Sequence, residues 1–222
     1  YIEESYYQIF CRQANYWVRF HNISDDHVAG TYDLQIAILN KLKEYDAPSL
    51  TWDQRVSYDV YYWYLDDKSR QKEFMYHDYI VNHYINSVID DLDYFFIYYP
   101  IQNNDYGDSF IKALEYTETT FADLMASMKK RESLGIFPPR FSVELTVEYL
   151  NSETPANPED HYYYTHLEEQ LAATSEISES KKTSLKQKAK EAIQNHVIPG
   201  FQALKEHLQY LLDTVGITDH GV

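Results

Sequence analysis

Histidines are the side chains that most directly suggest a metal site, because the sequence holds nine of them and only one cysteine. His161 and His166 are five positions apart, which is not the i, i+4 spacing that places two imidazoles on one helix face. His166 and Glu169 are three apart and could share a face. The sequence contains no His-Glu-x-x-His motif, so we interpret the histidines as surface or seam residues and predict no metal site.

Nucleophiles and acid/base pairs are equally hard to identify. Cys11 follows Phe10 in a helical pattern, which favours a small buried hydrophobe over a nucleophile. We interpret Asp90, Asp91 and Asp93 as a solvated helix face rather than as an acid/base pair. The sequence has no Gly-x-Ser-x-Gly elbow, no P-loop and no Gly-x-Gly-x-x-Gly loop. No catalytic residue is therefore predicted.

Arg140 is a candidate binding residue at the end of the stretch Leu-Gly-Ile-Phe-Pro-Pro-Arg, which begins at Leu134. Gly135 suits the left-handed residue that ends a helix. Pro138 and Pro139 forbid helix continuation, and Pro139 could open the next helix at its first position. An arginine placed after two prolines could clamp a carboxylate, although capping of the preceding helix is the favoured alternative.

The composition narrows the classes of partner. A formal net charge of −16 repels phosphate backbones and anionic lipid, so nucleic acid and acidic membranes are excluded as expected partners. No apolar run approaches the ~20 residues that a membrane-spanning helix needs. The 23 tyrosines suit half-buried seams between helices, or alternatively an aromatic ligand cleft. The compartment stays open between the cytoplasm and the cell envelope, and a start at Tyr1 without Met suggests a processed or trimmed piece.

Helical periodicity dominates the chain and must position these side chains. We expect an all-α, irregular multi-helix bundle that forms a single domain over residues 1–222, with few turns because only six residues are glycine. The helices are predicted at 3–20, 24–42, 51–67, 85–99, 105–131, 141–150, 162–173 and 181–215. The predicted helix caps are Ser24, a capping box of Thr51 and Gln54, and Asp105 or Asp108. The clearest apolar stripe is predicted at Phe110, Leu114, Thr117, Phe121, Leu124 and Met128. We predict a polar break at Lys68–Lys72, an irregular piece near Tyr76–Tyr84, and a kink or a two-piece helix at Pro199-Gly200.

The segment Phe141–Tyr149 allows two interpretations. Apolar and polar residues alternate strictly along it, which is typical of a strand. Val143, Val147 and Leu150 also share one helical face, and the sequence offers no convincing partner strand. Because a lone strand leaves its backbone groups unsatisfied, we predict a helix.

Three stretches together resemble the N-terminal part of the bacterial domain-of-unknown-function 885 family. They are Tyr98-Tyr99-Pro100-Ile101 with the helix that follows, the Leu134–Arg140 stretch, and Val197-Ile198-Pro199-Gly200-Phe201 with the segment leading to Ile217. Gly200 stands where that family usually has alanine. The resemblance covers most of the chain from about Ile23 onward.

The resemblance implies a predominantly helical protein similar to zinc metallopeptidases. Members of the family usually carry a His-Glu-x-x-Pro-Gly-His-His motif well downstream of this part, in which two histidines and an acid hold zinc while the glutamate activates water. That motif does not occur in this sequence. The resemblance therefore assigns no catalytic residue and no cofactor here, and zinc is expected only in a missing C-terminal part.

We therefore expect the N-terminal helical portion of a zinc-peptidase-like hydrolase, which forms one wall of a substrate cleft and lacks the catalytic motif itself. Its expected partners are the missing C-terminal catalytic portion and a peptide substrate. The candidate cleft residues are Tyr98, Tyr99 and Arg140. The alternative is a stand-alone helical binding or scaffold module of the cell envelope without catalysis.

Overall fold

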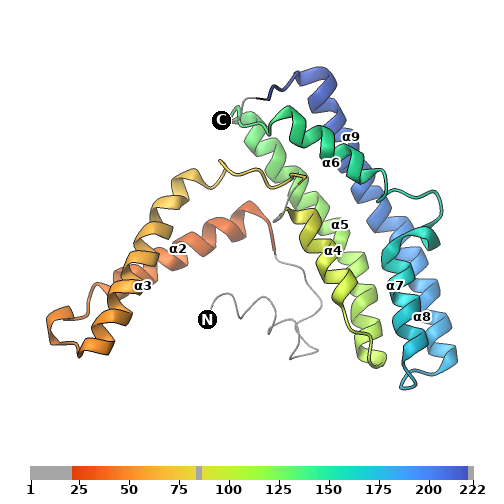
Figure 1. Ribbon diagram of the computed structural model, residues 1–222, viewed down its shortest axis with the longest axis horizontal. Coiled ribbons are helices and arrows are strands. Elements are labelled where there is room, and N and C mark those ends of the chain that lie inside the picture. Colours follow the sequence, from red (N-terminus) through yellow and green to blue (C-terminus); the bar gives the residue numbers. More distant parts are fainter. Residues whose placement is uncertain (1–21, 84–86, 220–222) are drawn as a thin grey trace. The chain divides into compact units, whose positions relative to one another are not determined.

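The computed structural model describes residues 22–83 and 87–219, and every regular element in these ranges is helical (Figure 1). The α-helices are α2 (Asp25–Leu42), α3 (Trp52–Gln71), α4 (Val88–Tyr98), α5 (Asn104–Ser133), α6 (Arg140–Leu150), α7 (Tyr162–Ala173), α8 (Glu179–Ala192) and α9 (Ile198–Tyr210). Short 3-10 turns are η1 (Ala47–Ser49), η2 (Lys72–Phe74) and η3 (Pro158–Asp160), and π turns are η4 (Ile193–Val197) and η5 (Leu211–Val215). The all-α prediction is confirmed. The helix predicted at 3–20 lies outside the described residues.

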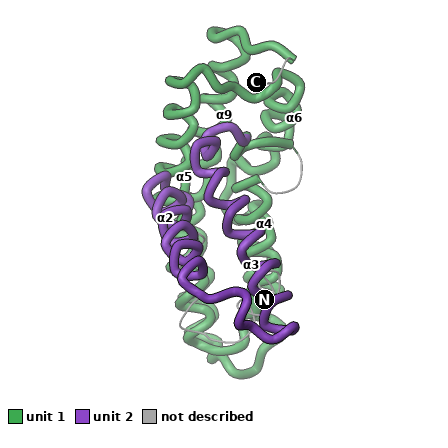
Figure 2. Tube along the Cα trace, turned by 90° about the vertical axis from the view of Figure 1, so that its left-hand side faces the viewer, with its two compact units in different colours: residues 1–22, 79–222 green, residues 23–78 purple. Residues whose placement is uncertain are grey.

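Contacts within the chain divide it into two compact units (Figure 2). Residues 23–78 form the smaller unit, and the described residues from 79 onward belong to the larger one. This division leaves the prediction of one domain over residues 1–222 untested, because two compact units can belong to one domain. None of the described helices combines the length and apolar character needed to cross a membrane.

The smaller unit is a helical hairpin of α2 and α3. Its helix starts follow the predicted caps: the Ser24 hydroxyl accepts the backbone N–H of His27, and Thr51 and Gln54 form a capping box. The predicted polar break at Lys68–Lys72 is wrong, because α3 continues to Gln71 and η2 follows directly. Side chains within that stretch pair with residues three or four positions away, which supports the last turns of the helix.

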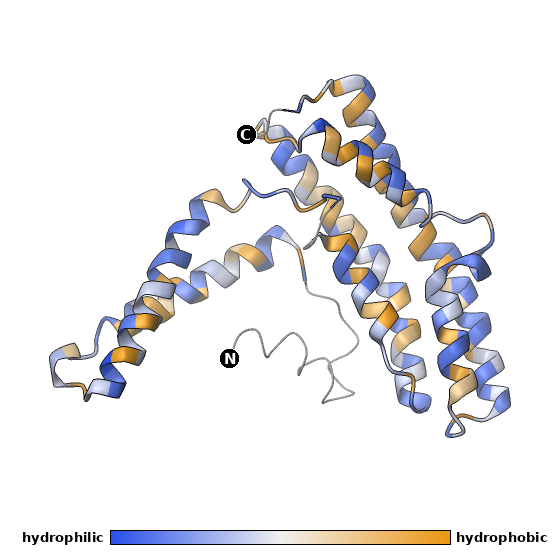
Figure 3. Ribbon diagram, viewed as in Figure 1, coloured by the Kyte–Doolittle hydropathy of each residue, from blue (hydrophilic) through white to orange (hydrophobic). Residues whose placement is uncertain are grey.

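Helix α5 is the centre of the larger unit and packs against α8, η4 and α9. Its predicted apolar stripe is buried at every position: Phe110, Leu114, Thr117, Phe121, Leu124 and Met128. The predicted cap at Asp105 or Asp108 is wrong, since the Asn103 side chain accepts the N–H groups of Asp105 and Tyr106. Figure 3 shows apolar residues recurring among polar ones along these helices. The core is aromatic where α4 and α7 join it, with Phe96 in ring contact with Phe110 and Tyr163.

Helices α8 and α9 form the predicted two-piece helix, joined by the π turn η4. Pro199 has no N–H to donate to the preceding turn, and a wider turn at that point tolerates the missing bond. The next residue, Gly200, has no side chain to accommodate, which matters because α9 approaches α5 closely there. A Cβ atom at Gly200 would lie 2.1 Å from the Cδ2 atom of Phe121.

Helix α6 confirms the helical prediction for Phe141–Tyr149. Gly135 is in the left-handed region with φ 76°, as predicted for the end of the preceding helix, and Gly216 has φ 70°. Pro139 was predicted at the first position of the next helix, but it is the N-cap of α6 and precedes the first helical residue, Arg140. Since Pro139 has no side-chain hydrogen-bonding group, the free N–H groups of α6 find acceptors elsewhere.

The acceptors come from the segment after η5. The Phe141 N–H donates to Asp219 Oδ1 at 3.0 Å, and the Arg140 N–H donates to the Thr218 carbonyl at 2.9 Å. We expect Asp219→Ala to lower the free energy of unfolding by about 1 kcal/mol, as loss of a helix cap does, in a urea titration. Thr218→Ala is the matched control, because it keeps the backbone carbonyl. Equal stability of the two variants would contradict a capping role for Asp219.

Candidate functional site

A buried carboxylate, Asp93 on α4, gathers three tyrosine hydroxyls from two other helices. Asp93 accepts hydrogen bonds from Tyr149 of α6 and from Tyr162 and Tyr163 of α7, the last at 2.8 Å. Its side chain is 9% exposed, and Tyr163 is completely buried. A buried carboxylate is stable only when its lone pairs are hydrogen-bonded, so this arrangement ties α4, α6 and α7 together.

The prediction of a solvated face at Asp90, Asp91 and Asp93 is wrong for Asp93. Ile89, Leu92, Asp93 and Phe96 are buried and recur at helical spacing, so they share the inner face of α4. Asp91 is exposed, in agreement with the prediction, while Asp90 caps the helix together with Ser87. Hydroxyl donors that are 56 to 70 positions away in sequence make the inward position tolerable for the carboxylate.

A second buried pair lies close to Asp93. Glu153 is 2% exposed and His161 is 1% exposed, and their Oε2 and Nε2 atoms face each other at 3.6 Å. Neither of these two atoms has a hydrogen-bond partner. The other ring nitrogen of His161 is occupied: Nδ1 accepts the backbone N–H of Tyr163 at 3.2 Å, which makes His161 the N-cap of α7.

Burial shifts the ionisation of all three groups toward their neutral forms. It raises the pKa of the Asp93 carboxyl to about 6, although hydrogen bonds from Tyr149 and Tyr163 oppose the shift. It raises the pKa of the Glu153 carboxyl to about 7, and the charge of Asp93 adds to the rise. It lowers the pKa of the His161 imidazole to about 4. Shifted pKa values that gather in one place mark a functional-site candidate.

The cluster can hold and exchange protons, but it is not placed to touch a substrate. Glu153 and His161 are sealed from solvent, whereas Tyr149 is 43% exposed and connects the cluster to the surface. From the sequence, His161 was considered only as half of a rejected metal pair, and Glu153 and Tyr149 were not predicted as site residues. One sequence feature could have pointed to the cluster: Tyr162 and Tyr163 directly follow His161.

The predicted cleft residues lie in different environments. Tyr98 is 68% exposed and stacks on Tyr94 at 5.8 Å between ring centroids. Tyr99 is 1% exposed and packs among core aromatic rings, so its ring is not available to a ligand in this arrangement.

Arg140 is bound to neighbouring groups of the larger unit. Its Nε atom pairs with Glu144 at 2.8 Å, and its Nη1 atom donates to the Leu212 carbonyl at 3.4 Å. The guanidinium thus contacts a carboxylate of its own helix and the end of the α9–η5 segment. It does not cap the helix that precedes the two prolines, which was the favoured alternative.

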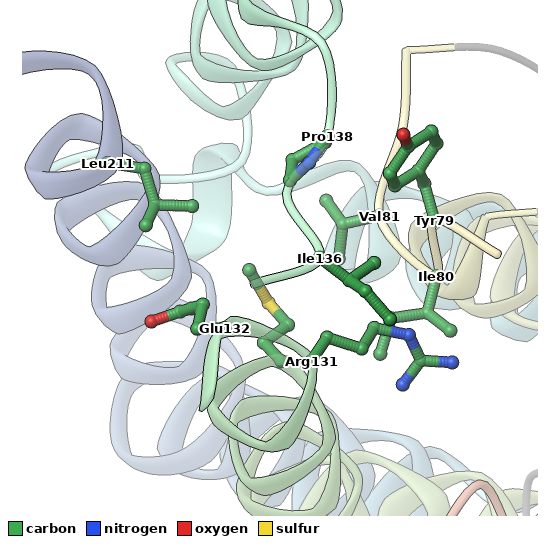
Figure 4. A pocket seen from close by; sticks show the side chains of 9 residues that line it. Tyr79, Ile80, Val81, Arg131, Glu132, Ile136, Pro138 and Leu211 are labelled. Carbon is green, nitrogen blue, oxygen red and sulfur yellow. The ribbon is translucent and has the colours of Figure 1, made fainter. Parts of the chain in front are cut away.

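A small pocket lies beside the Leu134–Arg140 stretch (Figure 4). It has a volume of about 20 Å³, which is room for a water molecule. Figure 4 shows apolar side chains of Val81 and Ile136 beside Arg131. Glu132 on the same wall pairs with His207 of α9 at 2.5 Å, which occupies its carboxylate. The pocket is too small for a peptide or a cofactor.

The zinc site of the family resemblance is expected outside this chain, and the residues that the structure describes offer no metal site of their own. Within 22–83 and 87–219, no three His, Cys, Asp or Glu side chains are grouped so that they could hold a metal ion. The buried pair Glu153 and His161 supplies two ligands where a protein zinc site uses three or four. No step of chemistry through a metal is assigned to this chain.

Comparisons with known proteins support the helical architecture. A crystal structure of a "putative lipoprotein" from Colwellia psychrerythraea matches with a TM-score of 0.75 and 16% sequence identity, over 85% of this chain and 34% of that one. This similarity concerns the fold, and the chain spans about a third of the length of that protein. No protein of curated function matches the chain in sequence. The model of one family, described as a bacterial protein of unknown function (DUF885), matches residues 14–220. The chain therefore belongs to the DUF885 family.

Proposed function

We propose that this chain is the helical, non-catalytic N-terminal portion of a longer zinc-peptidase-like protein, in which it forms one wall of a substrate cleft. An exposed apolar stripe along α6 is the observation that carries the proposal. Membership of the DUF885 family and the limited coverage of the structural relative support it, because both are compatible with a longer protein.

The stripe consists of Phe141, Leu145 and Tyr149, which recur every four residues along one side of α6. Their exposed fractions are 48%, 45% and 43%. The opposite side of α6 is buried in the larger unit through residues such as Val143 and Leu150. Three large apolar side chains in a row on a helix surface are typical of a site that binds another protein segment.

The acidic residues beside the stripe favour a particular kind of occupant. Glu148 and Glu144, the latter paired with Arg140, lie next to the apolar side chains, and both acids are exposed. A peptide segment with apolar residues and nearby basic residues would complement this surface in shape and charge. Tyr98 and Arg140 remain candidate contacts for such a segment. Tyr99 would support the wall from the core, without touching the ligand.

The description given for the Colwellia relative favours a second candidate function. A lipoprotein is held at the cell envelope, and a helical module there could bind peptide or carbohydrate without any catalysis. In that case the α6 stripe would be the binding surface itself. The reading frame beyond residue 222 separates the two functions, because a downstream His-Glu-x-x-Pro-Gly-His-His motif favours the peptidase-like protein.

The peptidase proposal is tested with both the present chain and the full gene product. We expect the full gene product to cleave peptides in a zinc-dependent manner, and the 222-residue chain to show no turnover with added zinc. In the full product, Phe141→Ser with Leu145→Ser should lower kcat/KM about tenfold or more, mainly by raising KM. Val60→Ser is the control, because Val60 is a 62% exposed apolar residue in the smaller unit.

Two results would overturn the proposal. One is chelator-sensitive turnover by the 222-residue chain alone. The other is an unchanged kcat/KM in a correctly folded Phe141→Ser/Leu145→Ser product, which would leave the stripe without a part in substrate binding. Far-UV circular dichroism of each variant shows whether its helices are intact.

A further inference from the structure

We propose that Glu153 and His161 form a buried proton-binding pair, with the proton held on the Glu153 carboxyl, that fastens the segment after α6 to the first turn of α7. This goes beyond the function proposed above and does not depend on it. The inference starts from the two facing atoms that lack partners, Glu153 Oε2 and His161 Nε2.

The cap of α7 fixes the tautomer of His161. Nδ1 accepts the Tyr163 N–H, so this nitrogen must keep its lone pair. A neutral imidazole then carries its hydrogen on Nε2, and that hydrogen faces Glu153 Oε2 at 3.6 Å between the heavy atoms. Protonation of Nδ1 would set two hydrogens against each other and break the cap. The geometry therefore holds His161 neutral.

The second carboxyl oxygen of Glu153, Oε1, is placed to carry the proton. Glu153 Oε1 lies 3.0 Å from Ser152 Oγ, which also lies 2.7 Å from the Tyr149 carbonyl. The serine hydroxyl has one hydrogen, and the carbonyl can only accept. If Ser152 donates to that carbonyl, Oε1 needs a hydrogen of its own to bond with Ser152. A protonated Glu153 thus gives Oε1 a hydrogen to donate to Ser152 and leaves Oε2 as the acceptor that faces the Nε2–H of His161.

The resulting chain of donors and acceptors runs in one direction. The Tyr163 N–H donates to Nδ1 of His161, and the Nε2–H of His161 faces Oε2 of Glu153. With the proton on Glu153, Oε1 becomes the donor across its 3.0 Å contact with Ser152 Oγ. Ser152 donates in turn to the Tyr149 carbonyl near the end of α6. Closing the 3.6 Å gap by a few tenths of an ångström would complete the chain.

Burial and the neighbouring charge favour a neutral, protonated state of the pair. The negative charge of Asp93 on α4 disfavours a second carboxylate nearby, and together with burial it outweighs the hydrogen bonds from Ser152 and from Tyr149 of α6, which lower the pKa of Glu153. Rings of Tyr162 and Tyr163 from α7 and of Phe201 from α9 cover His161. In η3, which leads into His161, Asp160 is exposed and Glu159 is paired with Lys190 of α8 at 2.8 Å.

The sign of the pH effect follows from the raised pKa of Glu153. A carboxyl whose folded pKa is about 7, above its ordinary 4.5, stabilises the fold fully below pH 4.5 and loses that contribution as the pH rises through about 7. His161 acts in the opposite sense: with a folded pKa of about 4, its contribution is present above pH 6.5 and is lost as the pH falls through about 4. Between pH 4.5 and pH 6.5 the two changes offset each other, and the pair is therefore most stabilising in this range.

Glu153→Gln tests the proposal, since the amide copies a protonated carboxyl in shape and donor pattern. We expect the variant to match the native protein near pH 5, and its unfolding equilibrium constant to be lower on the order of 100-fold at pH 8. Glu148→Gln is the control, because Glu148 is an exposed acid of α6. Stability curves of native and Glu153→Gln protein that stay parallel from pH 5 to 8 would overturn the proposal.

A measurement on the unchanged protein does not require that the variant folds. Nitrogen-15 NMR of His161 should show a neutral ring with its hydrogen on Nε2 from pH 5 to pH 8. The infrared carbonyl band of a protonated carboxyl should be present at pH 6 and weaker in Glu153→Gln, because Asp93, with a pKa of about 6, contributes to the same band. A His161 ring that gains a second proton near pH 6.5, or that carries its single hydrogen on Nδ1, would contradict the proposal.

Discussion

Asp93→Ala is expected to lower the free energy of unfolding by about 2–4 kcal/mol at pH 7, measured by urea titration. The substitution removes the common acceptor of three tyrosine hydroxyls. Tyr149 and Tyr162 can turn toward water, because both are partly exposed, but Tyr163 has no exposed surface. One buried hydroxyl left without a partner, together with the small cavity, accounts for the expected loss. Relief from burying a charge keeps the loss from being larger.

Related variants separate the hydrogen bonds from the space that the side chain fills. Tyr163→Phe should cost about 1 kcal/mol alone, and far less when Asp93→Ala is already present, because both variants remove the same hydrogen bond. Glu148→Ala removes an exposed acid and should change stability by less than about 0.5 kcal/mol. An Asp93→Ala protein as stable as the Glu148→Ala protein would show that the cluster does not hold the three helices together.

Gly200→Val is expected to destabilise the larger unit by about 1–3 kcal/mol. A Cβ atom at this position would lie 2.1 Å from Cδ2 and 2.6 Å from Cγ of Phe121, so the whole ring would have to move. The ring is 4% exposed and packs edge-on against Phe201 at 4.9 Å between centroids. Close packing on both sides leaves it little room. Thermal unfolding followed by circular dichroism measures the effect.

Gly30→Val is the matched control for this prediction. Gly30 also lies inside a helix, but a Cβ atom there would have no neighbour within 4 Å. Its replacement should leave stability nearly unchanged. Adding Phe121→Leu to Gly200→Val should cost less than the sum of the two single changes, because the smaller side chain makes room for the valine. Strict additivity would mean that the cost of Gly200→Val has another origin.

Elements with a regular apolar stripe and a clear cap were predictable from the sequence. The stripe from Phe110 to Met128 and the capping box at Thr51 were correctly predicted, because each depends on residues within a turn or two of helix. The family resemblance was confirmed by the match over residues 14–220. The zinc-peptidase-like activity and the cleft remain predictions.

The Asp93 cluster could not be predicted in the same way. Its members come from α4, α6, α7 and the segment before α7, and local spacing contains no information about such long-range contacts. Asp93 next to two other acids had the pattern of a solvated face, and only its place between Leu92 and Phe96 turns it inward. Buried acids need partners that the fold supplies, so one sequence without its contacts favours the solvated interpretation.

The π turn between α8 and α9 works as a correction of helical phase. Leu185, Ala189, Ile193, Val197 and Phe201 are all completely buried although each follows the last by four residues. In an ideal α-helix of 3.6 residues per turn, each such step would rotate the side chain by about 40°, so four steps would carry the last one nearly to the opposite side. The wider turn absorbs part of this rotation. The continuous segment of α8, η4 and α9 can thus keep the same side against α5 along its whole length.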